Sequence, residues 1–168
     1  MRSLVRPLCA VVCAFLALSA CGARAAPAGR IVQFGLCDSG SGKENYAQPD
    51  STAGYASRGN VMIGSPTDRI PLHKGVGFGY FWHASGLAPT FELKYHIQHP
   101  PIVRKDGKRV EMFEETLQLQ SVEGEFETAD CYFLDEDYEI VPGDWTITLL
   151  VQDKVLVTKT FHVVAGLR

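Results

Sequence analysis

The sequence predicts an all-β protein, because apolar and polar residues alternate with a period of two over most of the chain. The alternating runs are short, and residues that favour turns separate them. Near the C-terminus, Pro142 and Gly143 precede Trp145 at the start of such a run, as is typical of a hairpin. Seven or eight mostly antiparallel strands at this spacing predict an immunoglobulin-like β-sandwich, with an open β-barrel as the alternative.

The first half of the predicted domain contains three candidate strands and one long loop. The first strand has three apolar residues on one face, namely Val32, Phe34 and Leu36. Residues 38–59 are rich in Ser, Gly, Asn and Pro, and they predict a long loop or an irregular edge segment. Residues 67–73 predict a short edge strand, because Pro71 cannot donate to a sheet ladder. The next strand has its apolar face formed by Val76, Phe78, Tyr80 and Trp82.

Two longer strands follow. The clearest half-buried pattern in the chain places four apolar side chains on one face, those of Phe91, Leu93, Tyr95 and Ile97. Pro100 and Pro101 are expected to end this strand. Residues 109–120 are compatible with a helix or a strand, and their alternation favours the strand in an otherwise all-β chain.

The C-terminal segment predicts a hairpin and much of the core. Residues 141–144 fit a type II turn, since Pro142 fixes the first central φ and Gly143 tolerates the positive one. Residues 153–154 predict the tight turn between two strands whose apolar positions are Trp145, Ile147, Leu149, Val151, Val155, Val157, Phe161 and Val163. Trp145 and Phe161, with the turn residues Pro142 and Gly143, are the candidate structural core.

The N-terminus predicts export. Arg2 and Arg6 precede an uncharged apolar run over residues 8–18 that is too short to cross a bilayer as a stable helix. Residues 18–21, Leu-Ser-Ala-Cys, resemble the bacterial lipobox, in which case residues 1–20 are removed and Cys21 carries the lipid. Residues 23–25, Ala-Arg-Ala, fit the ordinary signal peptidase, which would remove residues 1–25 and release a soluble periplasmic protein. We expect a periplasmic or outer-membrane protein with a single domain over residues 26–168, and favour the lipid anchor.

Either cleavage removes Cys9 and Cys13, and Cys21 is either lost or lipidated, so two free thiols remain, those of Cys37 and Cys131. In an oxidising compartment, an isolated pair favours a disulfide, with two buried unpaired thiols as the alternative. The chain has no C-x-x-C motif, and no basic residue adjoins either cysteine to lower its pKa. A redox or nucleophilic role is therefore disfavoured.

The charge balance disfavours nucleic acid and anionic lipid as main partners. The chain has 16 Lys and Arg against 19 Asp and Glu, and the signal removes only bases, Arg2, Arg6 and Arg24. Many of the acids lie in residues 123–139, where no base occurs. Calcium binding is one interpretation of this run. A solvated edge strand and loop is the favoured one, because the spacing of an EF-hand is absent.

Candidate binding residues are few. Tyr80, Trp82 and Tyr95 could form a platform for a ligand, although their apolar strand faces favour the core. His96 and His99 are weak candidates for a metal, because residues three apart on a strand face opposite sides unless the chain bends. The Gly-rich residues 40–43 lack the spacing of a phosphate loop, and the sequence contains no G-x-S-x-G or H-E-x-x-H motif.

Two segments carry a resemblance to a known family. They are Phe-Glu-Leu-Lys-Tyr at residues 91–95 with His-Pro-Pro at residues 99–101, and residues 135–145 with Phe-His-Val at residues 161–163. Over residues 30–164 the chain resembles the bacterial proteins catalogued as domain of unknown function 3859. The resemblance implies no reaction. Members of that family often have Trp where Tyr138 stands, and Cys37 and Cys131 are additions in this chain, so the family does not imply the disulfide.

These observations favour a non-catalytic binding or interaction module whose partner is an envelope protein or a glycan. The first alternative is a periplasmic metal-binding protein that uses His96, His99 and the acidic residues 123–139. The second is an enzyme of unknown class, for which the sequence offers no combination of nucleophile, base and orienting residue. No cofactor is expected, and the only predicted membrane contact is a lipid on Cys21.

Overall fold

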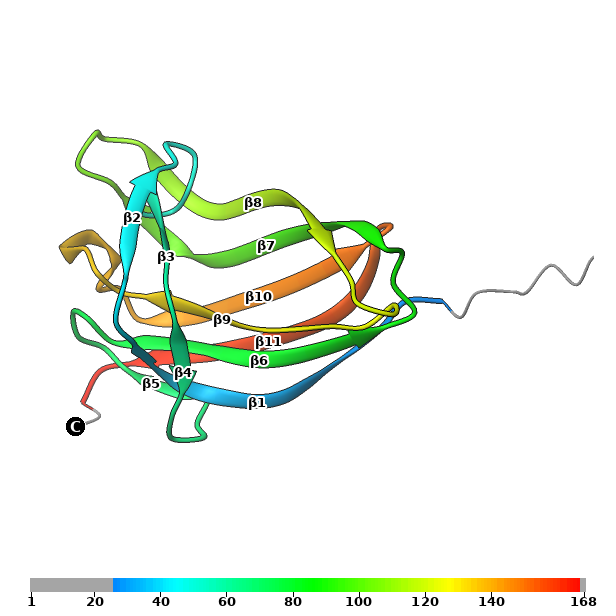
Figure 1. Ribbon diagram of the computed structural model, residues 1–168. Coiled ribbons are helices and arrows are strands. Elements are labelled where there is room, and N and C mark those ends of the chain that lie inside the picture. The colour runs from blue at the N-terminus through cyan, green and yellow to red at the C-terminus, as the bar shows by residue number, and fades with distance from the viewer. Residues whose placement is uncertain (1–25, 167–168) are drawn as a thin grey trace, which may run out of the picture.

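The computed structural model describes residues 26–166, which form two packed β-sheets and a separate two-stranded ribbon (Figure 1). The prediction of an all-β sandwich is confirmed. The only helical element among these residues is one 3-10 turn, η1 (Asp137–Glu139). The predicted signal, with both cleavage sites and Cys21, lies outside the described residues.

The four-stranded sheet has the order β4-β1-β6-β9, formed by β4 (Val61–Ile63), β1 (Ala28–Ser39), β6 (Gly77–Ser85) and β9 (Phe126–Phe133). The five-stranded sheet has the order β5-β11-β10-β7-β8, formed by β5 (Arg69–Pro71), β11 (Lys154–Val164), β10 (Gly143–Val151), β7 (Thr90–Val103) and β8 (Arg109–Gln120). β5 pairs in parallel with β11, and the other neighbours are antiparallel. The predictions of a strand at residues 109–120 and of an edge strand containing Pro71 are both confirmed.

Aromatic side chains fill the space between the sheets. Phe78, Tyr80 and Trp82 on β6 are fully buried, as are Trp145 on β10 and Phe161 on β11. Phe78 meets Trp145 edge to face at 5.9 Å between ring centroids and lies 5.1 Å from Phe161. Trp145 and Phe161 thus lie in the core, as the alternation of their strands predicts.

Two apolar residues assigned to the core are instead exposed. Val32 lies where the pairing of β1 with β6 shifts register, and 49% of its surface is exposed. Val155 is 50% exposed beside a similar shift in the β10–β11 pairing. An extra residue in one strand reverses the face of the residues around it, so strict alternation fails at both places.

The predictions around the prolines need correction. Pro100 and Pro101 do not end β7, which continues to Val103 with a register shift relative to β8 between Gln98 and Ile102. The two residues without N–H groups therefore fall where the regular ladder is interrupted.

The segment before Trp145 is not a type II turn. Pro142 is exposed, not in the core, because it lies outside the sheet just before β10. Gly143 is the first residue of β10 and has a φ of 136°. A Cβ at that position would lie 2.6 Å from Pro100 Cγ, so glycine is required by the close approach of β7 as well as by the positive φ.

The predicted loop at residues 38–59 contains an antiparallel ribbon. It is formed by β2 (Glu44–Ala47) and β3 (Tyr55–Arg58), which pair only with each other. The side chains of β2 are exposed, so this strand lacks the apolar alternation by which a strand is recognised in sequence. Figure 1 shows the ribbon running across one side of the sandwich, from β1 and β4 toward β8.

Candidate functional site

A pocket of about 260 Å³ lies beneath this β2–β3 ribbon, and we call it the ribbon pocket. Its wall comes from the ribbon, from β7 and β8 of one sheet, and from β9 of the other. β8 and β9 are the edge strands of their sheets and do not pair with each other. The ribbon therefore covers the space that two unpaired sheet edges leave open, and its inner side forms the roof of the pocket.

Carboxylates and tyrosines dominate the chemistry of the lining. Asp130 on β9, Glu115 on β8 and Tyr95 on β7 line the pocket, and Tyr46 and Tyr55 contribute from the ribbon. Within the described part of the chain, none of the lining residues is a Lys, Arg or His. The pocket is therefore rich in hydrogen-bond acceptors and negative charge.

Asp130 is the carboxylate of the pocket whose surroundings shift its pKa clearly. The indole N–H of Trp82 donates a hydrogen bond to its carboxylate, with 2.6 Å between Nε1 and Oδ2. Burial raises the pKa of Asp130 from 3.8 to about 6, although the bond from Trp82 acts in the opposite direction. Asp130 is half-buried and pairs with no basic side chain of residues 26–166, so it stays charged at neutral pH at the expense of folding free energy.

The three aromatic residues proposed from sequence as a platform are arranged around Asp130. Tyr80 and Trp82 are fully buried in the core, while Tyr95 is half-buried and lines the pocket. Burial raises the pKa of Tyr80 and Tyr95, and the charge of Asp130 adds to both shifts. The Tyr80 hydroxyl is buried without a hydrogen-bond partner. These residues therefore do not form an exposed platform.

The tip of the ribbon is fixed to the body of the domain by the loop between β2 and β3. Thr52 is 1% exposed, and its Oγ1 lies 3.1 Å from Nε2 of His99. Arg104, in the turn between β7 and β8, donates to the carbonyls of Pro49 and Ser51 at 2.5 and 3.2 Å. The Tyr138 hydroxyl donates to the Ala53 carbonyl at 2.7 Å. These bonds hold the roof at its outer end.

His99 connects the loop between β2 and β3 to the core. Its ring stacks on Trp145, with 4.6 Å between the ring centroids. Burial lowers the pKa of His99, which favours the neutral imidazole at physiological pH. Nδ1 lies 2.8 Å from the Pro100 carbonyl and Nε2 faces Thr52, so both ring nitrogens have protein partners.

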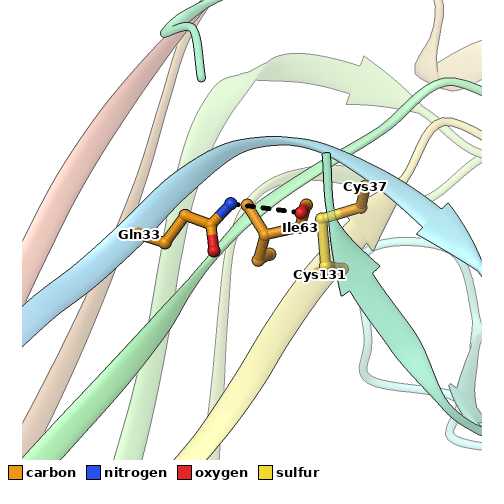
Figure 2. Close-up of a disulfide and its surroundings, with 4 residues drawn as sticks. All are labelled: Gln33, Cys37, Ile63 and Cys131. Carbon is orange, nitrogen blue, oxygen red and sulfur yellow. Dashed lines mark hydrogen bonds between the residues drawn. A yellow bond between two sulfur atoms is a disulfide. The ribbon is translucent and has the colours of Figure 1, made fainter. Parts of the chain in front are cut away.

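The other end of the ribbon is held by an ion pair and a disulfide. Lys43, just before β2, pairs with Asp135 and lies 4.6 Å from the centre of the Phe133 ring. Cys37 on β1 is bonded to Cys131 on β9, as Figure 2 shows. Cys131 also lines the pocket. The disulfide therefore joins the strand that leads into the ribbon to a wall of the pocket.

Figure 2 also shows how β4 is attached beside this bridge, where the Gln33 side chain donates to the Ile63 carbonyl at 3.2 Å. Between the two bridged strands lies β6, which carries Gly77 and Gly79 there. A Cβ on Gly79 would lie 1.9 Å from the Asp130 carbonyl oxygen. The close approach of β9 to β6 next to the pocket therefore depends on this glycine.

The acidic residues 123–139 are not all solvated, contrary to the prediction. β9 is an edge strand as expected, but Asp130 lines the pocket and Glu139 is fully buried. Glu139 accepts hydrogen bonds from the Tyr132 hydroxyl and from the backbone N–H of Glu136, the latter at 2.8 Å. Burial raises the pKa of Glu139. These contacts hold η1 against the pocket wall, since Tyr132 lines the pocket.

The two histidines proposed as metal candidates are not brought together at a site. His96 on β7 faces Glu114 on β8, with 3.6 Å between Nδ1 and Oε1. The two ring nitrogens of His99 face the Thr52 hydroxyl and the Pro100 carbonyl. Over residues 26–166, no group of three or more His, Cys, Asp or Glu is placed to hold a metal ion. The same residues include no helix of the length and apolarity that a membrane crossing requires.

Sequence reasoning missed the carboxylates of the pocket, although a signal for one of them was present. Phe126, Thr128, Asp130 and Tyr132 share one face of β9, and Phe126 and Tyr132 pack against the core. The same alternation that predicts buried apolar residues therefore places Asp130 inside. Glu115 alternates in the same way between Phe113 and Leu117 on β8.

Comparisons with known proteins agree with this architecture. An immunoglobulin-like protein from Pseudomonas aeruginosa, known from a crystal structure, matches with a TM-score of 0.59 and 25% identity, over 85% of this chain and 100% of its own. The immunoglobulin-like sandwich is therefore confirmed. The DNA-bound alkylpurine DNA glycosylase AlkC from Pseudomonas fluorescens matches with a TM-score of 0.39 and 14% identity, over 57% of this chain and 27% of its own. That second likeness supports no argument about activity.

No curated protein matches the chain. A family model described as a domain of unknown function, DUF3859, matches residues 26–163, which is nearly the whole described region. The resemblance predicted from the two sequence segments is thereby confirmed, and the chain belongs to the DUF3859 family.

Proposed function

We propose that this protein is an exported, non-catalytic binding module of the bacterial cell envelope, and that the ribbon pocket is its binding site. The observation that carries the proposal is a pocket whose roof is fixed at both ends by the protein itself. The contact of Thr52 with His99 holds one end. The ion pair between Lys43 and Asp135 and the Cys37–Cys131 disulfide hold the other end. A pre-formed pocket binds without having to order its own walls, which favours affinity.

The chemistry of the lining supports binding over catalysis. The hydroxyl of Thr52 faces His99, which is the arrangement of a nucleophile and a base. Thr52 lines the pocket, but Thr52 and His99 are only 1% and 4% exposed, and both nitrogens of His99 have protein partners. We therefore assign this pair the structural task of holding the ribbon.

Export is supported by residues 1–25 and by the disulfide, because disulfides persist outside the reducing cytoplasm. The partner class that we propose is an envelope component, either a protein segment or a glycan with a group small enough to enter the pocket. Anchoring through a lipid on Cys21 would place the pocket at a membrane surface.

Blocking the pocket tests this proposal. Ala56 lines the pocket from β3, whereas Ala47 on β2 is exposed and does not line it. We would screen the processed wild-type protein and the variants Ala56→Trp and Ala47→Trp by thermal shift against a defined set of amines, amino acids, short peptides and cell-wall sugars. Compounds should raise the melting temperature of the wild type and of Ala47→Trp, but not of Ala56→Trp. The same response in all three proteins would overturn the assignment of the pocket.

A further inference from the structure

We infer that the ribbon pocket takes a small organic cation, namely a protonated amine, held by carboxylates and tyrosine rings. This inference rests on the proposed binding function and specifies the ligand class of the same site.

The charge of the lining is the first step. Asp130 and Glu115 line the pocket, and neither is paired with a basic side chain of residues 26–166, while Asp135 at the same pocket is neutralised by Lys43. Pocket carboxylates without a basic partner favour any ligand that brings a positive charge. The same carboxylates would repel an anionic ligand.

Unsatisfied acceptors are the second step. Gln48 lines the pocket, and its side-chain oxygen Oε1 is buried without a hydrogen-bond partner among the described residues. Among the side chains of the described residues, Asp130 accepts a hydrogen bond only from the indole N–H of Trp82. Both groups need donors, and an ammonium group supplies three N–H donors and no acceptor. A carboxylate that accepts a charge-assisted hydrogen bond from such a group also regains part of the solvation that it lost on burial.

The aromatic residues are the third step. Tyr95 and Tyr132 line the inner wall, and Tyr46 lines the pocket from the ribbon. A cation over the face of an aromatic ring is attracted by the ring quadrupole, and cages of this kind recognise ammonium ligands. The guanidinium of Arg58 lies 5.2 Å from the centre of the Tyr46 ring, so Tyr46 already has a cation partner and we assign the ligand contact to Tyr95 and Tyr132.

Size limits the ligand further. A volume of about 260 Å³ lies just below the usual range of small-molecule pockets, so we expect an amine of a few heavy atoms or the aminoalkyl end of a larger partner. A partner of that second kind would insert its amine and leave the remainder outside.

Three probes of nearly equal size separate charge from shape: n-butylammonium, 1-butanol and n-butyrate. We would titrate each into the ¹⁵N-labelled processed protein near neutral pH and follow the amide signals of Ala56 and Tyr95, which line the pocket. We expect n-butylammonium to bind at least about tenfold more tightly than 1-butanol, with n-butyrate weakest. Asp130→Asn and Glu115→Gln should each reduce this preference, whereas Glu127→Gln, an exposed change on the same strand as Asp130, should retain it.

The outcomes separate the ligand class from the binding function. Equal shifts with n-butylammonium and 1-butanol, or tighter binding of n-butyrate, would overturn the cation but leave the pocket as a binding site. If none of the three probes moves the pocket signals and no screened compound discriminates Ala56→Trp from Ala47→Trp, both proposals fail. Two separate carboxylate variants keep the test valid if one of them does not fold.

Discussion

Replacing Asp130 with Asn should stabilise the protein at neutral pH, although it removes a charge from the candidate site. The side-chain amide of Asn can keep an oxygen acceptor for the Trp82 N–H, which lies 2.6 Å from the carboxylate. The titratable groups that face Asp130 are Tyr80 on β6, Tyr95 on β7 and, across the pocket, Glu115 on β8. Both tyrosines have raised pKa values and stay neutral at pH 7, so neither adds a negative charge beside Asp130.

The magnitude follows from the pKa of Asp130, which burial raises from 3.8 to about 6. Because the folded carboxyl holds its proton more tightly than the unfolded one, its contribution to stability is complete below about pH 4 and is lost as the pH rises through about 6. A shift of about two pH units corresponds to about 3 kcal/mol. Asp130→Asn should therefore be up to about 3 kcal/mol more stable than the wild type near pH 7.5 and nearly equal to it near pH 4.

Urea unfolding at several pH values measures this difference directly. Subtracting the wild-type curve from the Asp130→Asn curve removes the contributions of Glu139 and His99, whose pKa values are also shifted. Glu127→Gln, exposed on the same strand, serves as the control and should track the wild type. An Asp130→Asn protein that is less stable than the wild type near pH 7.5, or a difference that does not vary with pH, would refute this reasoning. A gain in stability with a loss of amine binding would show that the carboxylate is retained for its ligand.

Four further outcomes follow from the fold and the sequence. Trp145→Ala should cost about 3 to 5 kcal/mol in urea unfolding, because the ring is fully buried. Gly143→Val should also be destabilised in the same assay, since valine resists the φ of 136°. Removing both cysteines, Cys37→Ser with Cys131→Ser, should cost about 4 to 5 kcal/mol for a loop of 94 residues, and unreduced wild type with two alkylatable thiols would contradict this. Cys21→Ser should block processing and palmitate labelling, whereas a mature wild-type N-terminus at residue 26 would exclude the lipid anchor.

Much of the sandwich is encoded locally and could therefore be predicted. The alternation in residues 76–82 and 145–151 identifies two strands and the face of each that is buried, because successive side chains on a strand point to opposite sides. The burial of Trp82 and Trp145 follows from the same rule. The two remaining cysteines likewise suggest a pair without knowledge of the fold.

The site was less predictable, because its walls come from segments distant in the chain. Asp130, Glu115 and Tyr95 belong to three strands of two sheets, and the roof comes from a segment with no apolar alternation of its own. Alternation indicates the face of a residue, but not which residues of other strands that face will meet. Tyr95 was singled out with Tyr80 and Trp82, yet only the packing shows that it lines a pocket while the other two are covered.

By itself, the sequence therefore determined the all-β class, most inward-facing residues of the long strands and the family, since each depends on local period or on short motifs. Only the tertiary structure decided where strands bulge, that β7 continues past Pro100, and that residues 44–58 form a roof. These features depend on long-range contacts, such as Thr52 with His99 and Cys37 with Cys131, which no local pattern encodes. The same contacts enclose Asp130 and so change an acidic residue in a charged run into a half-buried carboxylate with a raised pKa.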